Sequence, residues 1–135
     1  MSVLNIRQDL RVSILEIESY LPDIVFENMK YDPSIGTNFV KCWVSFTQSL
    51  NPTMGDSFHR IVGIFRLELN FRLGTGEKDI ITVADIIKDH YKRGKTFGST
   101  CLQITDTPTI GVGFENGSRY IIPIQINWAA NVLGY

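Results

Sequence analysis

The alternation of apolar and polar residues from His59 to Leu73 constrains the fold of this chain more than any other stretch. One set of alternate positions is apolar or glycine: Gly63, Phe65, Leu67, Leu69, Phe71 and Leu73. In the other set the residues from position 66 onward are polar or charged: Arg66, Glu68, Asn70 and Arg72. A period of two is typical of a β-strand with one buried face. We therefore expect a long strand whose apolar side packs on a core while its polar side faces solvent or another molecule.

The residues after this strand predict a sharp turn and then an amphipathic helix. Gly74-Thr75-Gly76 supplies the turn. Thr82 is a candidate N-cap with Asp85 three positions on, as in a capping box, and Gly94 is placed to end the helix. The expected buried stripe has helical spacing and consists of Val83, Ile86, Ile87 and Tyr91.

A strand, a Gly-x-Gly turn and a helix also occur together in dinucleotide-binding sites. Here the position of the third glycine is Asp79, and Asp79 with Glu77 would repel a pyrophosphate at the start of the helix. We therefore interpret the two glycines as structural and expect no cofactor.

The rest of the chain predicts one more helix and five further strands. Residues 2–21 form the helix, which ends before Pro22 and buries Ile6, Leu10, Ile14, Ile17 and Leu21. The strands are expected over 23–29, 39–47, 100–105, 109–115 and 119–128, with a polar loop over 48–58. In the strand over 109–115 the side chains expected to point inward are Ile110, Val112 and Phe114.

Two local signals refine the end of the chain. Asn116-Gly117 predicts a tight hairpin turn, because such a turn needs positive φ at its central residues. Pro123 has no N–H to donate to a sheet, which places the last strand at a sheet edge or at a bulge.

These elements predict an α+β fold: a mainly antiparallel β-sheet with two α-helices packed on one face. A chain of 135 residues, 44% of them hydrophobic, can bury a core as one domain over residues 1–135. The two cysteines, Cys42 and Cys101, lie in apolar strand-like runs, so we expect buried, reduced thiols.

Charge and hydropathy argue against several classes of protein. The net charge of −1 gives no general attraction to nucleic acid or to an anionic membrane. No stretch approaches the ~18 consecutive apolar residues of a membrane helix. The first residues, MSVLNIRQDL, lack the basic and apolar regions of a signal peptide, so we expect a protein of the cytosol.

Candidate catalytic and metal-binding residues are few. Ser57 lies two residues from His59, which is not a spacing known for an activated serine, and His90 falls on the predicted helix. We therefore expect that the chain is not an enzyme. No histidine or cysteine pair has metal-ligand spacing, so we also expect no metal site. Two alternatives of a different class stay open: a small hydrolase using Ser57 and His59, and a nucleic-acid-binding module using the basic cluster Lys88, Lys92, Arg93 and Lys95.

Two features are candidate contact surfaces. The polar row of the long strand combines charges of both signs, which set the register of an interface more than its raw affinity. The loop over 48–58 is longer than a tight hairpin needs, and such loops are often functional. The candidate interface residues are therefore Arg66, Glu68, Asn70 and Arg72 on the strand, with Asn51, Met54 and Asp56 in the loop.

Three features together resemble the tail-terminator (tail-completion) proteins of long-tailed phages. The first is an amphipathic N-terminal helix followed by Phe26-Glu27-Asn28. The second is the block from Gly63 to Leu69 that continues through Gly74-Thr75-Gly76 into Ala84-Asp85-Ile86-Ile87. The third is a last strand that ends in Ile126-Asn127-Trp128. The resemblance spans nearly the whole chain.

This resemblance implies a structural, non-enzymatic subunit of the virion that is assembled in the host cytoplasm. It implies a homo-oligomeric ring, commonly a hexamer, that caps the last ring of tail-tube protein at the head-proximal end of the tail. The ring would stop tube polymerisation and offer a joining surface to a head-side connector or neck protein. Genomic DNA would pass through its lumen without specific binding, which suits a near-neutral protein. Another component of the neck or head–tail connector is an alternative.

Overall fold

The computed structural model describes residues 3–27, 38–50, 59–74, 78–98, 102–117 and 119–132, and the statements below concern these residues. Strand β3 (His59–Arg72) lies at the centre of the fold. It pairs antiparallel with β2 (Phe39–Leu50) on one side and, over its whole length, with β8 (Arg119–Val132) on the other. The expected long strand is therefore confirmed, and it ends one residue before Leu73, whose side chain is 38% exposed.

Shorter strands complete one eight-stranded sheet in the order β1-β2-β3-β8-β5-β4, with β6 and β7 also paired to β8. Only the pairing of β1 with β2 is parallel. The short strands are β1 (Asp23–Phe26), β4 (Thr96–Phe97), β5 (Leu102–Ile104), β6 (Thr109–Ile110) and β7 (Phe114–Asn116).

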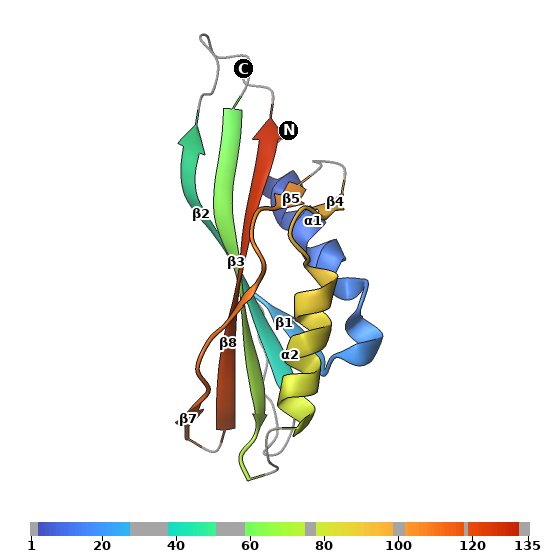
Figure 1. The fold of residues 1–135 in the computed structure, drawn as a ribbon, viewed down its shortest axis with the longest axis vertical. Helices are drawn as coiled ribbons and strands as arrows, with labels where there is room; N and C mark the ends of the chain where they lie inside the picture. The colour runs from blue at the N-terminus through green and yellow to red at the C-terminus, as the bar shows by residue number, and fades with distance from the viewer. Residues whose placement is uncertain are drawn as a thin grey trace.

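Two α-helices, α1 (Val3–Leu15) and α2 (Lys78–His90), lie on the same face of this twisted sheet (Figure 1). A short 3-10 helix, Glu18–Tyr20, links α1 to β1. The core fills the layer between helices and sheet, and its largest fully buried side chains include Trp128, Tyr91 and Phe65. The predicted α+β architecture is confirmed.

Both helices differ in length from the sequence prediction. Helix α1 ends at Leu15 rather than Leu21, because the backbone hydrogen bonds after Val12 shorten to a 3-10 pattern and turn the chain toward β1. Helix α2 begins at Lys78, before the predicted cap. The hydroxyl of Thr82 donates to the carbonyl of Lys78 at 2.7 Å, as a serine or threonine does inside a helix. The capping box at Thr82 is therefore wrong.

Strand β2 continues into part of the predicted loop. Residues 48–50 pair with Val62, Ile61 and Arg60 after an irregularity between Phe46 and Gln48. The sequence predicts these polar residues to be part of a loop. They form a strand instead, because β3 continues beside them as a pairing partner. The remainder of that loop, 51–58, lies outside the described residues.

The predicted strand over 109–115 is instead two short strands, β6 and β7. The prediction that three of its side chains point inward is also wrong. Ile110, Val112 and Phe114 are 37%, 89% and 45% exposed. The ladder breaks between β6 and β7, so Ile110 lies opposite Ile124 while Phe114 lies opposite Ile121. These two residues consequently occupy opposite faces of the sheet.

The hairpin between β7 and β8 is confirmed, and Gly117 has a φ of +64°. Of the two alternatives expected for the last strand, the sheet edge is wrong, since β8 has partners on both sides; the other, an irregularity, agrees with the break in the ladder between β6 and β7 opposite Pro123. Pro123 has no N–H to donate, and the strand accommodates it because its nitrogen faces the gap between β6 and β7. Its carbonyl accepts a hydrogen bond from the N–H of Gly111 at 2.8 Å.

Candidate interaction surface

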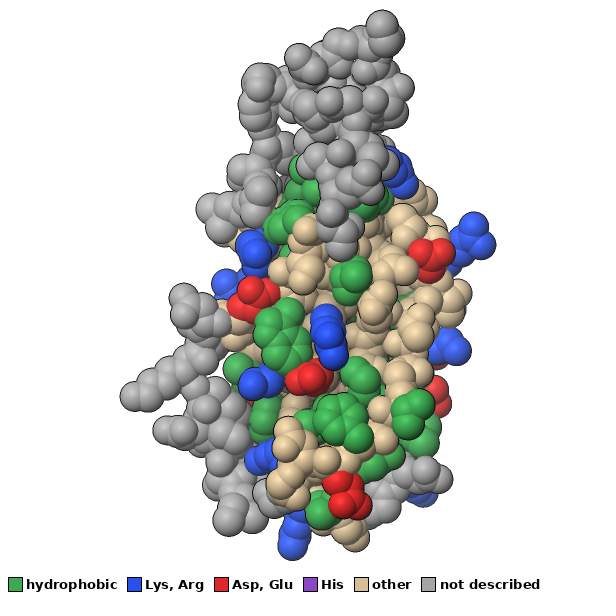
Figure 2. All heavy atoms as spheres, turned by 90° about the vertical axis from the view of Figure 1, so that its left-hand side faces the viewer, with side chains coloured by type: hydrophobic (Ala, Val, Ile, Leu, Met, Phe, Trp, Pro, Cys, Tyr) green, Lys and Arg blue, Asp and Glu red, His purple; other side chains and the backbone are tan. Residues whose placement is uncertain are grey.

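The face of the sheet opposite the helices forms the first candidate surface. The register places Trp43, Arg66, Gln125 and Thr109 in one row across β2, β3, β8 and β6. Lys41, Glu68 and Pro123 form the next row. Figure 2 shows this face: hydrophobic side chains alternate with single Lys, Arg, Asp and Glu side chains, and no one type covers it. We call it the outer face.

Arg66 and Glu68 lie at the centre of the outer face. Arg66 is exposed and borders two shallow hollows, one toward Trp43 and Ser45 and one toward Thr109 and Pro123. Glu68 is half-buried in the row beside Lys41. Opposite charges on neighbouring strands contribute favourably to a sheet and remain available to a partner.

The other two residues of the predicted polar row have structural contacts. Asn70 is only 5% exposed, and its side-chain amide donates to the carbonyl of Glu68 at 3.1 Å. It lies between Phe39 and Ile121, which are also buried. The backbone N–H of Arg72 donates to the side-chain oxygen of Asn38 at 2.9 Å. The predicted loop residues Asn51, Met54 and Asp56 lie outside the described part of the chain.

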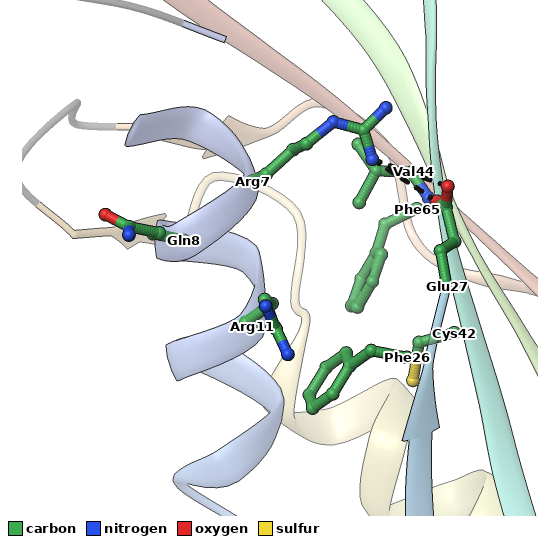
Figure 3. A pocket seen from close by; sticks show the side chains of 8 residues that line it. All are labelled: Arg7, Gln8, Arg11, Phe26, Glu27, Cys42, Val44 and Phe65. Atoms are coloured by element: carbon green, nitrogen blue, oxygen red, sulfur yellow. Dashed lines mark hydrogen bonds and ion pairs between the residues drawn. The ribbon is translucent and has the colours of Figure 1, made fainter. Parts of the chain in front are cut away.

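A second surface, which the sequence did not reveal, is a hollow of about 280 Å³ between α1, β1 and β2 (Figure 3). We call it the α1–β2 hollow. It has an apolar floor and a charged rim, and its lining consists of Arg7, Gln8, Arg11, Phe26, Glu27, Cys42, Val44 and Phe65. The spacing of Arg7 and Arg11 on α1 places both on one helix face, which is the one signal the sequence offered.

Glu27 connects the two sides of the hollow. Strand β1 ends at Phe26, opposite Cys42, so no further pairing with β2 occurs on this side among the described residues. The Glu27 carboxylate accepts a hydrogen bond from the Val44 N–H and lies 3.4 Å from Nη1 of Arg7. Its carboxylate thus satisfies a backbone N–H at this edge of β2.

Arg11 differs from Arg7 in its partner. Its guanidinium lies 4.5 Å from the centre of the Phe26 ring, and no described carboxylate lies within ion-pair distance of it. A cation over an aromatic face is attracted to it and still has N–H groups for an anion.

The residues weighed for catalysis are placed as follows. Ser57 is outside the described residues, and His59 lies in β3. His90 is bound to the Ser13 carbonyl at 2.7 Å. Burial raises the pKa of the Cys42 thiol well above its usual range, which disfavours the reactive thiolate. Within the described ranges, no group of three or more His, Cys, Asp or Glu could hold a metal ion.

The basic cluster at the end of α2 is exposed at Lys88, Lys92, Arg93 and Lys95. Lys95 lies over the Phe97 ring at 5.0 Å.

None of the described helices is long and apolar enough to span a membrane.

Comparison with known proteins assigns this architecture to a family. A family model described as phage tail terminator protein matches residues 6–128. One solved structure has a similar fold, with a TM-score of 0.69 and 18% sequence identity over 96% of each chain. No curated protein matches the chain. Because the family model spans both helices and most of the sheet, the chain belongs to the phage tail terminator proteins, which are structural components of the phage tail.

Proposed function

We propose that this chain forms a closed homo-oligomeric ring that caps the tail tube, stops its polymerisation and provides the surface for head–tail joining. The family match over residues 6–128 carries this proposal. The number of copies expected from the resemblance is six. In the virion the ring would lie at the head-proximal end of the tail, between the last ring of tube protein and a head-side connector, with DNA passing through its lumen.

The outer face supports such a role because it is a broad, mixed-charge surface on a rigid sheet. Strands β2, β3 and β8 are long and paired, so the backbone that carries Arg66 and Glu68 is ordered before any partner binds. A partner then loses little conformational entropy to ordering this surface. We assign Arg66, Glu68 and Arg72 to partner contact, Asn70 to support beneath them, and Asn51, Met54 and Asp56 to a contact in the segment between β2 and β3.

Tail assembly in cells that lack this chain tests the capping function. We expect tubes of uncontrolled length and no joining to heads, because nothing then ends polymerisation, and electron microscopy measures both outcomes. Tubes of normal length that still join heads would contradict the proposal.

A pair of matched double variants tests the outer face. We expect Arg66→Ala/Glu68→Ala to reduce the yield of joined particles, because it removes two opposite charges from this surface. Lys88→Ala/Asp89→Ala removes the same two types of charge from exposed positions of α2 and serves as the control. Equal particle yields from the two variants would show that Arg66 and Glu68 on the outer face do not contact a partner needed for joining.

A further inference from the structure

The segment 109–116, here named the β6–β7 segment, presents apolar side chains from a fixed backbone. The N–H of Gly111 donates to the Pro123 carbonyl at 2.8 Å, and β7 pairs with β8 on the far side of the break. A Cβ at Gly111 would lie 2.8 Å from Cγ of Pro123. A Cβ at Gly113 would overlap the Tyr120 hydroxyl. The backbone therefore rests directly on β8 at both glycines.

This close approach leaves apolar side chains in solvent. Val112, between the two glycines, is 89% exposed, and Phe114 is 45% exposed. Single exposed apolar residues are ordinary on protein surfaces. Ile110, on the opposite face from Phe114, is exposed as well, so both sides of this segment carry exposed apolar side chains on a backbone that is already ordered, which is typical of a binding surface.

The α1–β2 hollow lies at the opposite edge of the same sheet. The strand order separates the two surfaces, since β1 and β2 are at one end and the β6–β7 segment pairs with β8 on the side away from β3. A ring of identical subunits needs two different, complementary surfaces on opposite sides of each subunit. The two edges satisfy that requirement.

The two surfaces also match in size and charge. A cavity of about 150 Å³ can hold a benzene ring, and the hollow, at about 280 Å³, is larger. Its floor includes Phe26 and Phe65, which suit an apolar side chain. Glu115, next to Phe114, is exposed and has no ion-pair partner among the described residues. Arg11 on the rim of the hollow likewise has no described carboxylate partner.

We propose that the β6–β7 segment of one copy docks in the α1–β2 hollow of the next copy, with Phe114 over the apolar floor and Glu115 against Arg11. This inference rests on the proposed ring function and names the two surfaces that would join its subunits. The occupant is a second copy of this chain, because the same sequence supplies both complementary halves on opposite edges.

A matched pair of substitutions tests the apolar contact. Native mass spectrometry of the chain on tail tubes should show that Phe114→Ser weakens ring assembly on the order of tenfold or more, as for a central interface residue. Ile81→Ser replaces an apolar side chain of similar exposure on α2, which contributes to neither surface, and should leave assembly unchanged. Equal assembly of the two variants into rings would overturn the docking inference and leave the ring proposal intact. A wild-type chain that stays monomeric on tubes would overturn both.

Charge reversal tests the pairing of Glu115 with Arg11. Each single variant, Arg11→Glu or Glu115→Arg, should lose assembly, and the double variant should regain it, because the double reversal restores one attractive pair at every interface. Thermal unfolding of each variant checks that the monomer is still folded. Failure of the double variant to exceed both single variants would overturn the pairing.

Cross-linking tests the direction of the contact. The double variant Arg11→Cys/Glu115→Cys should form a ladder of covalent oligomers under oxidation, since each copy joins a different neighbour at each edge. Either single variant should give no ladder. Covalent dimers alone would indicate a two-fold symmetric contact and contradict this arrangement, and cross-links to a tube or connector protein would show that a different partner occupies the hollow.

Discussion

Gly63 and Trp128 lie directly opposite each other on β3 and β8. A Cβ at position 63 would overlap the Ser45 carbonyl and lie 2.5 Å from Cζ2 of Trp128. The Trp128 ring is also held at 5.4 Å from the Phe46 ring in an edge-on contact. Glycine is therefore required here for space, because the Trp128 ring occupies the volume that a side chain would need.

We predict that Gly63→Ala lowers the free energy of unfolding by about 1–3 kcal/mol, the usual range for overpacking a core. Urea denaturation of the variant and the wild type gives the difference directly. Alanine has a better strand propensity than glycine, so a gain in stability would show that the Trp128 ring can move aside and that the packing described here is wrong.

His90 joins the two helices through its ring. Nε2 lies 2.7 Å from the Ser13 carbonyl and therefore carries the proton, which leaves Nδ1 as the acceptor facing Nζ of Lys95 at 3.4 Å. Burial lowers the pKa of His90, and the Lys95 charge lowers it too, against the raising effects of the Ser13 bond and of Glu16. The neutral ring is the form that the fold favours.

This lowered pKa predicts a pH-dependent stability. Below the ordinary value of 6.5 the unfolded chain binds a proton that the folded chain resists, so the free energy of unfolding falls as pH drops through that region. Denaturation midpoints between about pH 7 and pH 5, above the range where most carboxylates titrate, would measure the slope. His90→Gln should flatten it, and an unchanged slope in that variant would assign the effect to other groups.

The stability of helix α2 could come from a cap at Thr82 or from burial of its apolar residues. Thr82 lies inside the helix, whereas Ile80, in its first turn, is 1% exposed. We predict that Thr82→Ala changes the free energy of unfolding by less than about 0.5 kcal/mol, because it is an exposed helical position. Ile80→Ala should cost about 2–5 kcal/mol through the cavity it leaves. Chemical denaturation compares them, and a loss near 1 kcal/mol at Thr82 would restore the capping role.

Local sequence pattern predicted some of the strands correctly and others not. Strand β3 was predictable because its period of two is unbroken from Phe65 to Arg72, and the fold class followed from it. The β6–β7 segment has the same alternation, but its backbone rests on Pro123 and Tyr120 at two glycines, and that contact exists only once β8 is in place. Local pattern alone cannot show such a break.

The candidate surfaces show the same limit. Arg66 and Glu68 were predictable as outward-facing because they alternate with core residues of β3. Asn70 has the same parity, yet neighbouring strands bury it beside Phe39. The α1–β2 hollow needs Arg7, Glu27 and Val44 together, and these come from three elements whose contacts are set by tertiary packing.

For the whole molecule, the arrangement of layers defines the role. Both helices cover one face of the sheet, so the outer face and the two sheet edges are left as broad, ordered surfaces (Figure 1). The described residues form a core in a single layer between helices and sheet, which suits a rigid subunit that assembles without refolding. This arrangement is consistent with the structural role of the phage tail terminator family.

Electron microscopy of tail tubes assembled with the purified chain shows directly whether this chain caps the tube. We expect a closed ring of this chain on one end of each tube, and tubes that stop growing once the ring is present. Tubes that continue to grow with the chain attached as separate monomers, or that carry no density for it at either end, would show that this chain is not a capping ring.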